Sequence, residues 1–384
     1  MKIKGIEAIH LKLPPRQDYR WAGLLVGLGD FLLVKIQAEN GRIGYGETVP
    51  LIDWGGDYHH YYGESPQTAR HVIHDYLAPV LVGENLFGFE AAHTAMDRVV
   101  KGHPYAKAAI EIALYDLAGK LLEVPVYQLL GGKVREKIPI AHMLGLMAPA
   151  QAIPEAERVA AEGIRAFQVK GGLDINRDIQ LISALRARLG DQINLRLDAN
   201  QGYPTPKVAI QAIRRMEADG LNLVEQPVEG ISGLAQVTAA VSCLVIADES
   251  VWTPQDALTI AQTHAVDALS IYIGKAGGLL KAKKISDIAE AARLRCDVNG
   301  SLELGVGNAA NLHLAAATKV IDLANVIPIN GPAGQGPTEF AGRYFADDIV
   351  REPFKYADGF VIISDQPGLG VEVDEAKIER YRVA

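Results

Sequence analysis

The chain has 384 residues, which at about 150 residues per domain suggests two or three domains. Hydrophobic residues make up 49% and charged residues 22%, so a mostly disordered chain is excluded. With 46 acidic against 38 basic residues, the net charge of −8 argues against sequence-independent binding of nucleic acid, which needs a basic face.

No apolar leader follows Met1, and no run of about 18 uninterrupted apolar residues occurs. We therefore expect no signal peptide, no membrane span and, by default, a cytoplasmic protein. Cys243 and Cys296 lie in apolar, strand-like runs, and we expect both to be reduced core residues.

Residues 1–130 are predicted to form an α+β domain. Polar and apolar residues alternate over 2–13, and residues 31–38 form an apolar run. Glu39-Asn40-Gly41 indicates a hairpin turn before a strand over 43–47. Helical periodicity follows from about 66 to 123.

From residue 131, short apolar runs alternate with helical stretches. The runs cover 138–145, 167–172, 194–200, 223–227, 244–249, 268–274, 296–300 and 325–330. Anchor residues near their ends recur at intervals of 23 to 28 residues, which fits one strand, one helix and two loops per unit. Eight such units predict a (β/α)8 barrel, or TIM barrel, over 131–350.

A doubly wound open sheet is the alternative, but the evenly sized units and the lack of a Gly-x-Gly-x-x-Gly motif after a strand disfavour it. The remaining segment, 351–384, has one strand-like run at 359–364. It is too short to stand alone, and we expect it to pack on the N-terminal domain.

Three consecutive predicted strands end in acids, at Asp198, Glu225 and Asp248. Neighbouring strands lie about 4.8 Å apart, so these carboxylates converge and repel one another unless a cation lies between them. Oxygen ligands select a hard divalent ion, Mg²⁺ or alternatively Mn²⁺. The competing interpretation is that each acid caps the helix that follows it.

Lys170 ends the strand before the acidic series. Half-buried beside a dication, it would favour the neutral form and act as a general base; the alternative is a solvated lysine or an ion-pair partner. Tyr272 and Lys275 follow on the far side of the series, where Lys275 either places a second cation over the site or anchors a carboxylate. Glu303 is either a hydrogen-bond partner of substrate or an ordinary acid at a helix N-terminus.

The motifs FQVKGG, LRLDANQGY, LVEQP, IADES, KAGGL and NGSLELGVG occur in this order between residues 167 and 307. Together they resemble the enolase superfamily, and most closely its muconate-lactonizing-enzyme (mandelate racemase/muconate cycloisomerase) subgroup. Residues 105–132 are typical of the junction between cap and barrel in that family. The resemblance implies a modified, enolase-like barrel with an N-terminal capping domain that the C-terminal tail completes.

The resemblance also implies roles for single residues. Asp198, Glu225 and Asp248 match the Mg²⁺ ligands, and Glu249 matches an acid beside the metal. Lys170 matches the second lysine of a Lys-x-Lys motif, the base that removes a proton α to a carboxylate. This chain departs from the family at Gln168, which replaces the first lysine of that motif.

A second departure lies on the sixth strand. Tyr272 replaces the lysine expected there as a second base, which weakens a two-base racemase, although tyrosine can deliver a proton. Lys275 matches the lysine before the Gly-Gly pair.

Two N-terminal loops, residues 14–29 and 50–63, are expected over the barrel mouth, although their aromatic residues fit the core of the small domain as well. A metal site at His59-His60 is disfavoured because the carboxylates form a better-defined one. The residues expected to bind substrate are Arg20, Trp54, Tyr58, Gln168, Asn200, Asn299 and Glu303.

These observations predict Mg²⁺-dependent removal of a proton α to a carboxylate, most simply by a cycloisomerase or dehydratase of a small carboxylic acid. A racemase or epimerase of an amino-acid derivative is the alternative within the family. A Schiff-base aldolase that uses Lys170 and a non-catalytic binding protein are the alternatives of other classes. The resemblance also implies a homo-oligomer.

Overall fold

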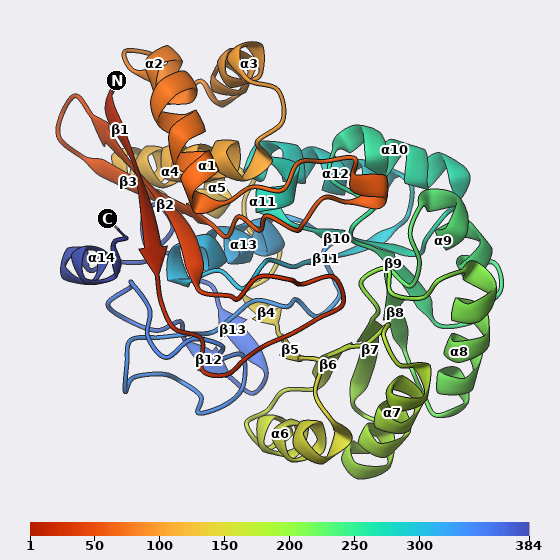
Figure 1. The fold of residues 1–384 in the computed structure, drawn as a ribbon. Coiled ribbons are helices and arrows are strands. Elements are labelled where there is room, and N and C mark those ends of the chain that lie inside the picture. The colour runs from red at the N-terminus through yellow and green to blue at the C-terminus, as the bar shows by residue number, and fades with distance from the viewer. Residues whose placement is uncertain (384) are drawn as a thin grey trace.

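The computed structural model describes residues 1–383 and opens with an antiparallel sheet (Figure 1). Its strands β1 (Ile3–Lys12), β2 (Asp30–Ala38) and β3 (Ile43–Thr48) pair in this order. The predicted hairpin turn lies between β2 and β3, where the backbone N–H of Gly41 donates to the carbonyl of Ala38 at 2.9 Å. The strand predictions for this region are confirmed.

The helices that follow pack on one face of this sheet or on one another. They are α1 (Pro66–Val72), a π-helical turn (Ile73–Leu77), α2 (Ala78–Leu81), α3 (Phe89–Val99), α4 (Pro104–Leu122) and the short α5 (Val126–Leu129). Helix α4 is buried on nearly its whole circumference because it lies between the capping sheet and the barrel. Gly46 on β3 permits this contact, since a Cβ there would clash with the carbonyl oxygen of Ala109.

The second half of the chain forms a curled parallel sheet with helices outside it (Figure 1). Its seven strands, in spatial order, are β5 (Ala141–Leu144), β6 (Ala166–Lys170), β7 (Asn194–Asp198), β8 (Leu223–Glu225), β9 (Leu244–Ala247), β10 (Ala268–Ile271) and β11 (Arg295–Val298).

The helices between them are α6 (Pro149–Ala161), α7 (Ile175–Leu189), α8 (Pro206–Ala218), α9 (Ile231–Thr238), α10 (Pro254–Thr263), α11 (Ile273–Ala276) and α12 (Leu279–Ala291), with α13 (Gly305–Ala317) after β11. The sheet is buried on both sides, which is typical of a TIM-type barrel. The predicted barrel class is confirmed.

The prediction of an eighth regular strand over 325–330 is wrong. Asn325 forms only an isolated bridge to Ile140, and Ile321 another to Cys296. The side chain of Asn325 replaces part of a ladder by accepting from the backbone N–H of Val298 at 2.7 Å. Pro328 has no N–H to donate, so this segment closes the barrel through single bridges rather than a strand.

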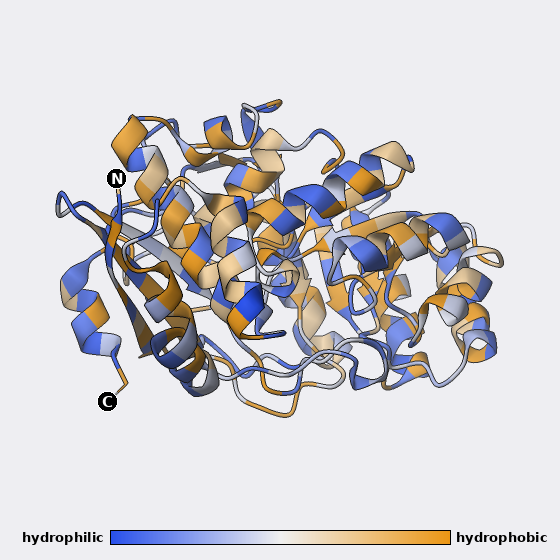
Figure 2. Ribbon diagram, turned by 90° about the horizontal axis from the view of Figure 1, so that it is seen from above, coloured by the Kyte–Doolittle hydropathy of each residue, from blue (hydrophilic) through white to orange (hydrophobic). Residues whose placement is uncertain are grey.

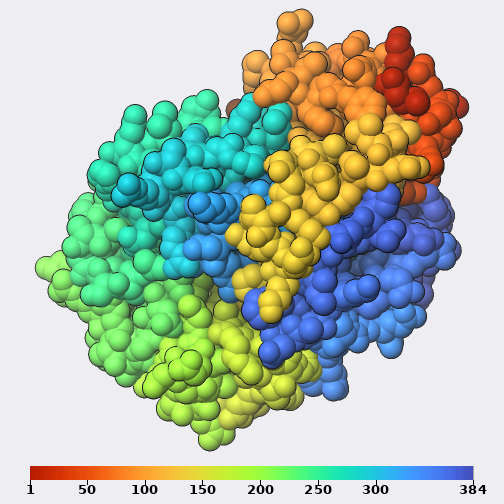
Figure 3. All heavy atoms as spheres, turned by 180° about the vertical axis from the view of Figure 1, so that it is seen from behind, coloured from red at the N-terminus to blue at the C-terminus, as the bar shows by residue number. Residues whose placement is uncertain are grey.

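The C-terminal segment joins both halves of the molecule. β12 (Tyr356–Ala357) and β13 (Phe360–Ile362) form a small sheet with β4 (Lys137–Pro139), while α14 (Glu375–Tyr381) lies against the capping sheet. Seen from behind, this blue segment lies beside the capping domain (Figure 3). The Lys35 ammonium lies 2.7 Å from Glu375. The limits 1–130, 131–350 and 351–384 stay predictions.

Apolar residues line the inner faces of the sheets and helices (Figure 2). Cys243 and Cys296 are buried free thiols, as expected. Within the described part of the chain, none of the helices has both the length and the apolar character that crossing a bilayer requires.

Candidate active site

The strand register places the predicted acids side by side. Lys170 on β6 pairs with Asp198 on β7, and Asp198 pairs with Glu225 on β8. Asp248 follows β9 directly. All four side chains are buried, which places a lysine and three acids together at the carboxyl ends of the strands, where TIM barrels carry their active sites.

Lys170 is more deeply buried and more strongly paired than the sequence indicates. Only 5% of the residue is exposed, and its ammonium donates to Asp198 Oδ2 at 2.5 Å and to Asn200 Oδ1 at 3.3 Å. Burial lowers the pKa of Lys170, but the charges of Asp198 and Glu225 outweigh burial and raise it. The expectation of a half-buried side chain is wrong, because Lys170 is almost fully buried; the neutral amine expected beside a dication stays a prediction.

Gln168 links two of the acids. Its amide nitrogen donates to Asp198 Oδ2 at 3.0 Å and to Glu225 Oε2 at 2.7 Å. A lysine at this position would bring a second positive charge, whereas glutamine brings two neutral N–H donors. Lys170 is therefore the only charged side chain that β6 contributes to the cluster.

A buried ion network below the acids was missed by the sequence analysis. Arg196 donates through Nε to Glu225 Oε2 at 2.6 Å and also pairs with Asp297 on β11. Arg196 precedes Asp198 by two residues and thus shares its face of β7. That alternation is the signal that identifies Arg196 as a partner inside the barrel.

Burial and neighbouring charges shift the pKa values of the three acids in different directions. Burial, followed by the charge of Glu225, raises the pKa of Asp198 to about 7. Burial also raises the pKa of Asp248. At Glu225 burial acts in the same direction, but the charges of Arg196 and Lys170 outweigh it and lower the pKa.

The donor set fits a hard dication such as Mg²⁺. Asp248 Oδ2 and Glu249 Oε2 are buried and have no hydrogen-bond partner within residues 1–383, and every acidic donor is an oxygen. Within the same residues, no three His, Cys, Asp or Glu side chains already form a metal-binding group. Gln168 donates to both Asp198 and Glu225, and Lys170 donates to Asp198, so these two side chains satisfy carboxylate oxygens instead.

Lys275 anchors an acid. Its ammonium donates to Asp248 Oδ1 at 2.6 Å and to the carbonyl oxygens of Asp248 and Ser270 at 2.5 and 3.3 Å. Of the two interpretations of Lys275, the structure favours the anchor, since its three donors all have partners and the residue is 2% exposed.

Tyr272 stands across the barrel from Lys170. It directly follows β10, which is separated from β6 by the three strands that lead to the acids. Its ring stacks on Trp54 with the centroids 6.1 Å apart, and the ammonium of Lys275 lies 4.6 Å from its centroid. Burial, followed by the charge of Asp248, raises the pKa of Tyr272 well above its ordinary value, so its phenol stays protonated at neutral pH.

The backbone is left-handed just beyond the ends of two of the strands that carry the acids. Asn200 has φ of 43° and Gln226 of 35°. The Gln226 side chain accepts from the backbone N–H of Asp248 at 2.8 Å and donates to Ser250 Oγ at 2.8 Å. It therefore ties the end of β8 to the end of β9, and the strained conformation occurs at the site rather than elsewhere in these strands.

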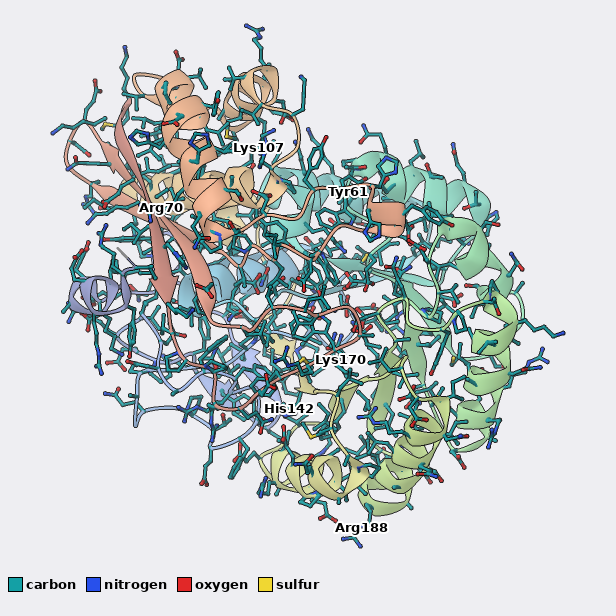
Figure 4. The ribbon with its side chains drawn as sticks, viewed as in Figure 1. Tyr61, Arg70, Lys107, His142, Lys170 and Arg188 are labelled. Carbon is teal, nitrogen blue, oxygen red and sulfur yellow. The ribbon has the colours of Figure 1, made fainter. Side chains whose placement is uncertain are left out.

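A small inner cavity lies at these strand ends. Of the predicted site residues, Lys170, Tyr272, Trp54, Gln168, Asn200 and Asn299 line it, together with Trp21, Leu51, Met143, Gly300, Ser301, Leu302 and Val326. Its space of about 20 Å³ holds about one water molecule. Figure 4 shows Lys170 near the centre of the molecule, beside the loop that connects β1 to β2.

Three predicted substrate-binding residues do not line this cavity. Arg20 pairs with Asp18 at 3.0 Å, and the next residue, Trp21, takes the cavity position. Tyr58 is 70% exposed. Glu303 is buried and accepts from the backbone N–H of Ser301 at 3.2 Å, and burial raises its pKa to about 7.

An outer cleft of about 570 Å³ adjoins the inner cavity and shares Trp21, Trp54 and Asn200 with it. The loop of residues 50–63 forms much of its wall and lies over the barrel, as the resemblance implied (Figure 1). Tyr61 fastens this loop by stacking on Trp252, with centroids 4.6 Å apart, and by donating to Asp256 at 2.5 Å (Figure 4). The aromatic residues of this loop therefore do not belong to the core of the small domain.

Two family models match the chain. The model described as mandelate racemase / muconate lactonizing enzyme, N-terminal domain, covers residues 14–131, and the one described as enolase C-terminal domain-like covers residues 151–377.

Curated relatives match over the full length. N-succinyl-L-Arg/Lys racemase of Bacillus cereus is 31% identical over 100% of this chain and 98% of its own, and its crystal structure superimposes with a TM-score of 0.90. Muconate cycloisomerase 1 of Rhodococcus opacus is 33% identical over 99% of this chain and 98% of its own. The Enterococcus faecalis dipeptide epimerase structure, complexed with Mg and the dipeptide L-Leu-L-Tyr, is 32% identical, with a TM-score of 0.86 over 97% of this chain and 100% of that one.

Proposed function

Because this chain belongs to the enolase superfamily, in its muconate-lactonizing-enzyme subgroup, and is an isomerase or lyase of that superfamily, we propose that Lys170 removes the proton α to the carboxylate of a small acid. One observation carries this proposal. The amine of Lys170 lies in the wall of the inner cavity and at 2.5 Å from Asp198, the first acid of the series.

The proposed base must be neutral before it accepts a proton. The charges of Asp198 and Glu225 are what keep Lys170 protonated, so neutralising these two carboxylates returns its pKa toward the low value that burial favours. We propose Asp198, Glu225 and Asp248 as ligands of Mg²⁺. Bound there, Mg²⁺ supplies the positive charge that stabilises an enolate of the substrate.

We assign roles to four further side chains at the site. Gln168 and Asn299 present amide groups to the substrate, and Lys275 holds Asp248 in place through its three hydrogen bonds. Tyr272 keeps its proton at neutral pH, so it serves as an acid and not as a base. Elimination of a β-leaving group needs a base on only one face of the substrate. The same holds for the formation and opening of a lactone. We therefore favour a dehydratase or cycloisomerase.

Epimerisation is the second candidate, and the position of Tyr272 supports it. Lys170 removes the proton on one face, and the Tyr272 hydroxyl returns a proton to the other. The return reaction would need a tyrosinate, which burial and the neighbouring acids oppose. The forward step also leaves this tyrosinate, together with a protonated Lys170, so epimerisation by this pair would be slow in both directions.

Solvent-deuterium exchange followed by NMR tests the proposal. The protein with Mg²⁺ is incubated in D₂O with a panel of muconate-like diacids, hydroxy acids, sugar acids and acylated amino acids. We expect deuterium at the α-carbon of at least one acid and loss of the exchange with EDTA. Exchange that is insensitive to EDTA, or a covalent adduct with Lys170 trapped by borohydride, would contradict the proposal.

A further inference from the structure

Helix α13 begins beside the inner cavity without a capping side chain of its own. Its N-cap residue is Leu304, whose side chain offers no acceptor, and the preceding residues Gly300–Leu302 form part of the cavity wall. The first N–H groups of a helix need acceptors. Here, acids from distant parts of the chain supply them.

Two of these N–H groups donate to Glu47, on β3 of the capping sheet. Its Oε1 accepts from the backbone N–H of Leu304 at 2.6 Å, and its Oε2 accepts from that of Gly307 at 2.9 Å. Asp348 of the C-terminal segment accepts from the N–H of Gly305 at 3.0 Å. Glu47 is fully buried, and α13 lies against β3 (Figure 1). The capping domain therefore holds the start of a barrel helix.

The backbone next to this contact is strained. Leu302 is buried and has φ of 65°, a left-handed conformation that leucine rarely adopts. Such a conformation persists only where surrounding contacts impose it. The N–H of Leu304, two residues away, donates to Glu47, and the N–H of Ser301 donates to Glu303 at 3.2 Å. These contacts hold Leu302 in the cavity wall.

The chain that follows Glu47 forms another part of the same wall. The loop of residues 50–63 leaves β3 directly and carries Leu51 and Trp54 to the inner cavity. One carboxyl group therefore lies at the junction of two parts of the wall that come from different halves of the molecule.

This position is unfavourable for a charge. Burial raises the pKa of Glu47 well above its ordinary value, and the charges of Asp348 and Glu303 add to the rise, while the N–H groups of Gly307 and Leu304 oppose it. Acids perturbed in this way cluster at functional sites.

We propose that Glu47 is a positioning residue for the proposed reaction. By binding the start of α13 from the capping domain, it holds Leu302 and Trp54 at a fixed separation and keeps the substrate carbon within reach of Lys170. Glu47 acts through the backbone of Leu304 and does not touch the substrate. This inference rests on the proposed function, because it takes the inner cavity as the place of the reaction.

Glu47→Gln replaces one acceptor oxygen with an NH₂ group, which repels the backbone N–H that it faces. Well below the melting temperature, we expect kcat for α-deuterium exchange to fall about tenfold, because small displacements of reacting groups are costly. The Kd of Mg²⁺, measured by calorimetry, should change by less than about twofold, since Glu47 contacts none of the proposed ligands.

Asp374→Asn is the matched control. Asp374 caps α14 by accepting from the backbone N–H of Ala376 at 3.0 Å, and α14 does not contribute to the cavity wall. This variant removes a carboxylate from a helix start, as Glu47→Gln does, and should leave kcat and the Kd of Mg²⁺ unchanged.

Tryptophan fluorescence reports on the cavity without a substrate. Two of the three tryptophans, Trp21 and Trp54, line it. Glu47→Gln should increase the quenching of this fluorescence by acrylamide, and Asp374→Asn should not. A helix cap that serves only stability would lower the melting temperature and leave both quenching and kcat of the folded protein unchanged.

A double-variant cycle tests the link to Leu302. Asparagine resembles leucine in shape and adopts left-handed backbone more readily, so Leu302→Asn should need less restraint. In that background, Glu47→Gln should lower kcat only about twofold. Glu47→Asp keeps the charge but withdraws it by one methylene group, and it should show the same changes to a smaller degree if Glu47→Gln does not fold.

Unchanged quenching or kcat in the folded Glu47 variant, weakened Mg²⁺ binding, or equal losses of kcat in the two backgrounds would overturn the inference. If the wild-type protein exchanges no α-proton, the proposed reaction fails, and the quenching comparison alone then decides whether Glu47 positions the cavity wall.

Discussion

Tyr272 is the residue that most clearly separates the candidate reactions. It occupies the face of the cavity opposite Lys170, stacks on Trp54 and is protonated at neutral pH. A lysine at this position would act as a base on the second face. Under the proposed function, the tyrosine would confine base catalysis to Lys170 and leave the second face with a proton donor.

Tyr272→Phe keeps the stacking on Trp54 and removes only the hydroxyl. We expect α-deuterium exchange to stay within about threefold of the wild-type rate, while product formation falls about 100-fold, because general-acid catalysis contributes on that scale. NMR measures both rates in one sample. An equal loss of exchange and turnover would show that Tyr272 is not the acid.

Residue placement was predictable from the sequence where strand periodicity governs it. The positions of Lys170, Asp198, Glu225 and Asp248 follow from their places at the ends of consecutive strands. Arg20 and Tyr58 lie on loops, whose course depends on tertiary contacts such as those of Asp18 and Glu229 rather than on any period. For that reason the sequence analysis placed Trp54 correctly at the inner cavity, whereas Arg20 and Tyr58 lie away from it and Trp21 was not anticipated.

At the scale of elements, the junction between β3 and α4 positions the capping domain. Gly46 lets the strand approach the helix, which is buried between the sheet and the barrel. The loop of residues 50–63 leaves β3 directly and carries Trp54 to the cavity. The regular spacing of strands and helices was predictable from the sequence. The way residues 325–330 close the barrel was not, because it depends on the side chain of Asn325.

Gly46→Ala tests this junction. The added methyl group overlaps the carbonyl of Ala109, so we expect the free energy of unfolding to fall by about 1–3 kcal/mol and the melting temperature to fall with it. Gly5→Ala on β1 is the matched control, since no heavy atom lies within 4 Å of the new methyl group. Equal melting temperatures of the two variants would contradict the packing argument.

For the whole molecule, the acid cluster links proton binding to stability and, in the proposed function, to metal binding. Burial and the charge of Glu225 raise the pKa of Asp198 to about 7 in the folded chain, above the value of about 4 for an exposed aspartate. At a pH between these two pKa values, the folded state binds more protons than the unfolded state. The contribution of Asp198 to the stability of the metal-free protein is therefore lost as the pH rises from about 4 to about 7.

Under the proposed function, Mg²⁺ binds the ionised carboxylates and so competes with these protons. We therefore expect the rise in melting temperature on adding Mg²⁺ to be small at pH 5.5 and to grow through pH 7 toward pH 8.5. Thermal unfolding with Mg²⁺ or EDTA measures it, and Asp198→Asn should flatten the dependence. A Mg²⁺ effect that is the same from pH 5.5 to 8.5 would argue against proton competition at this cluster.

The most direct test of the account concerns the amine that faces the acids. With any acid that the wild-type protein deuterates at the α-carbon, Lys170→Ala should lower the NMR exchange rate about 1,000-fold. Mg²⁺ should still bind as tightly or more tightly, because the variant removes a positive charge next to Asp198. Exchange at the wild-type rate in Lys170→Ala, with Mg²⁺ bound, would show that another group takes the proton.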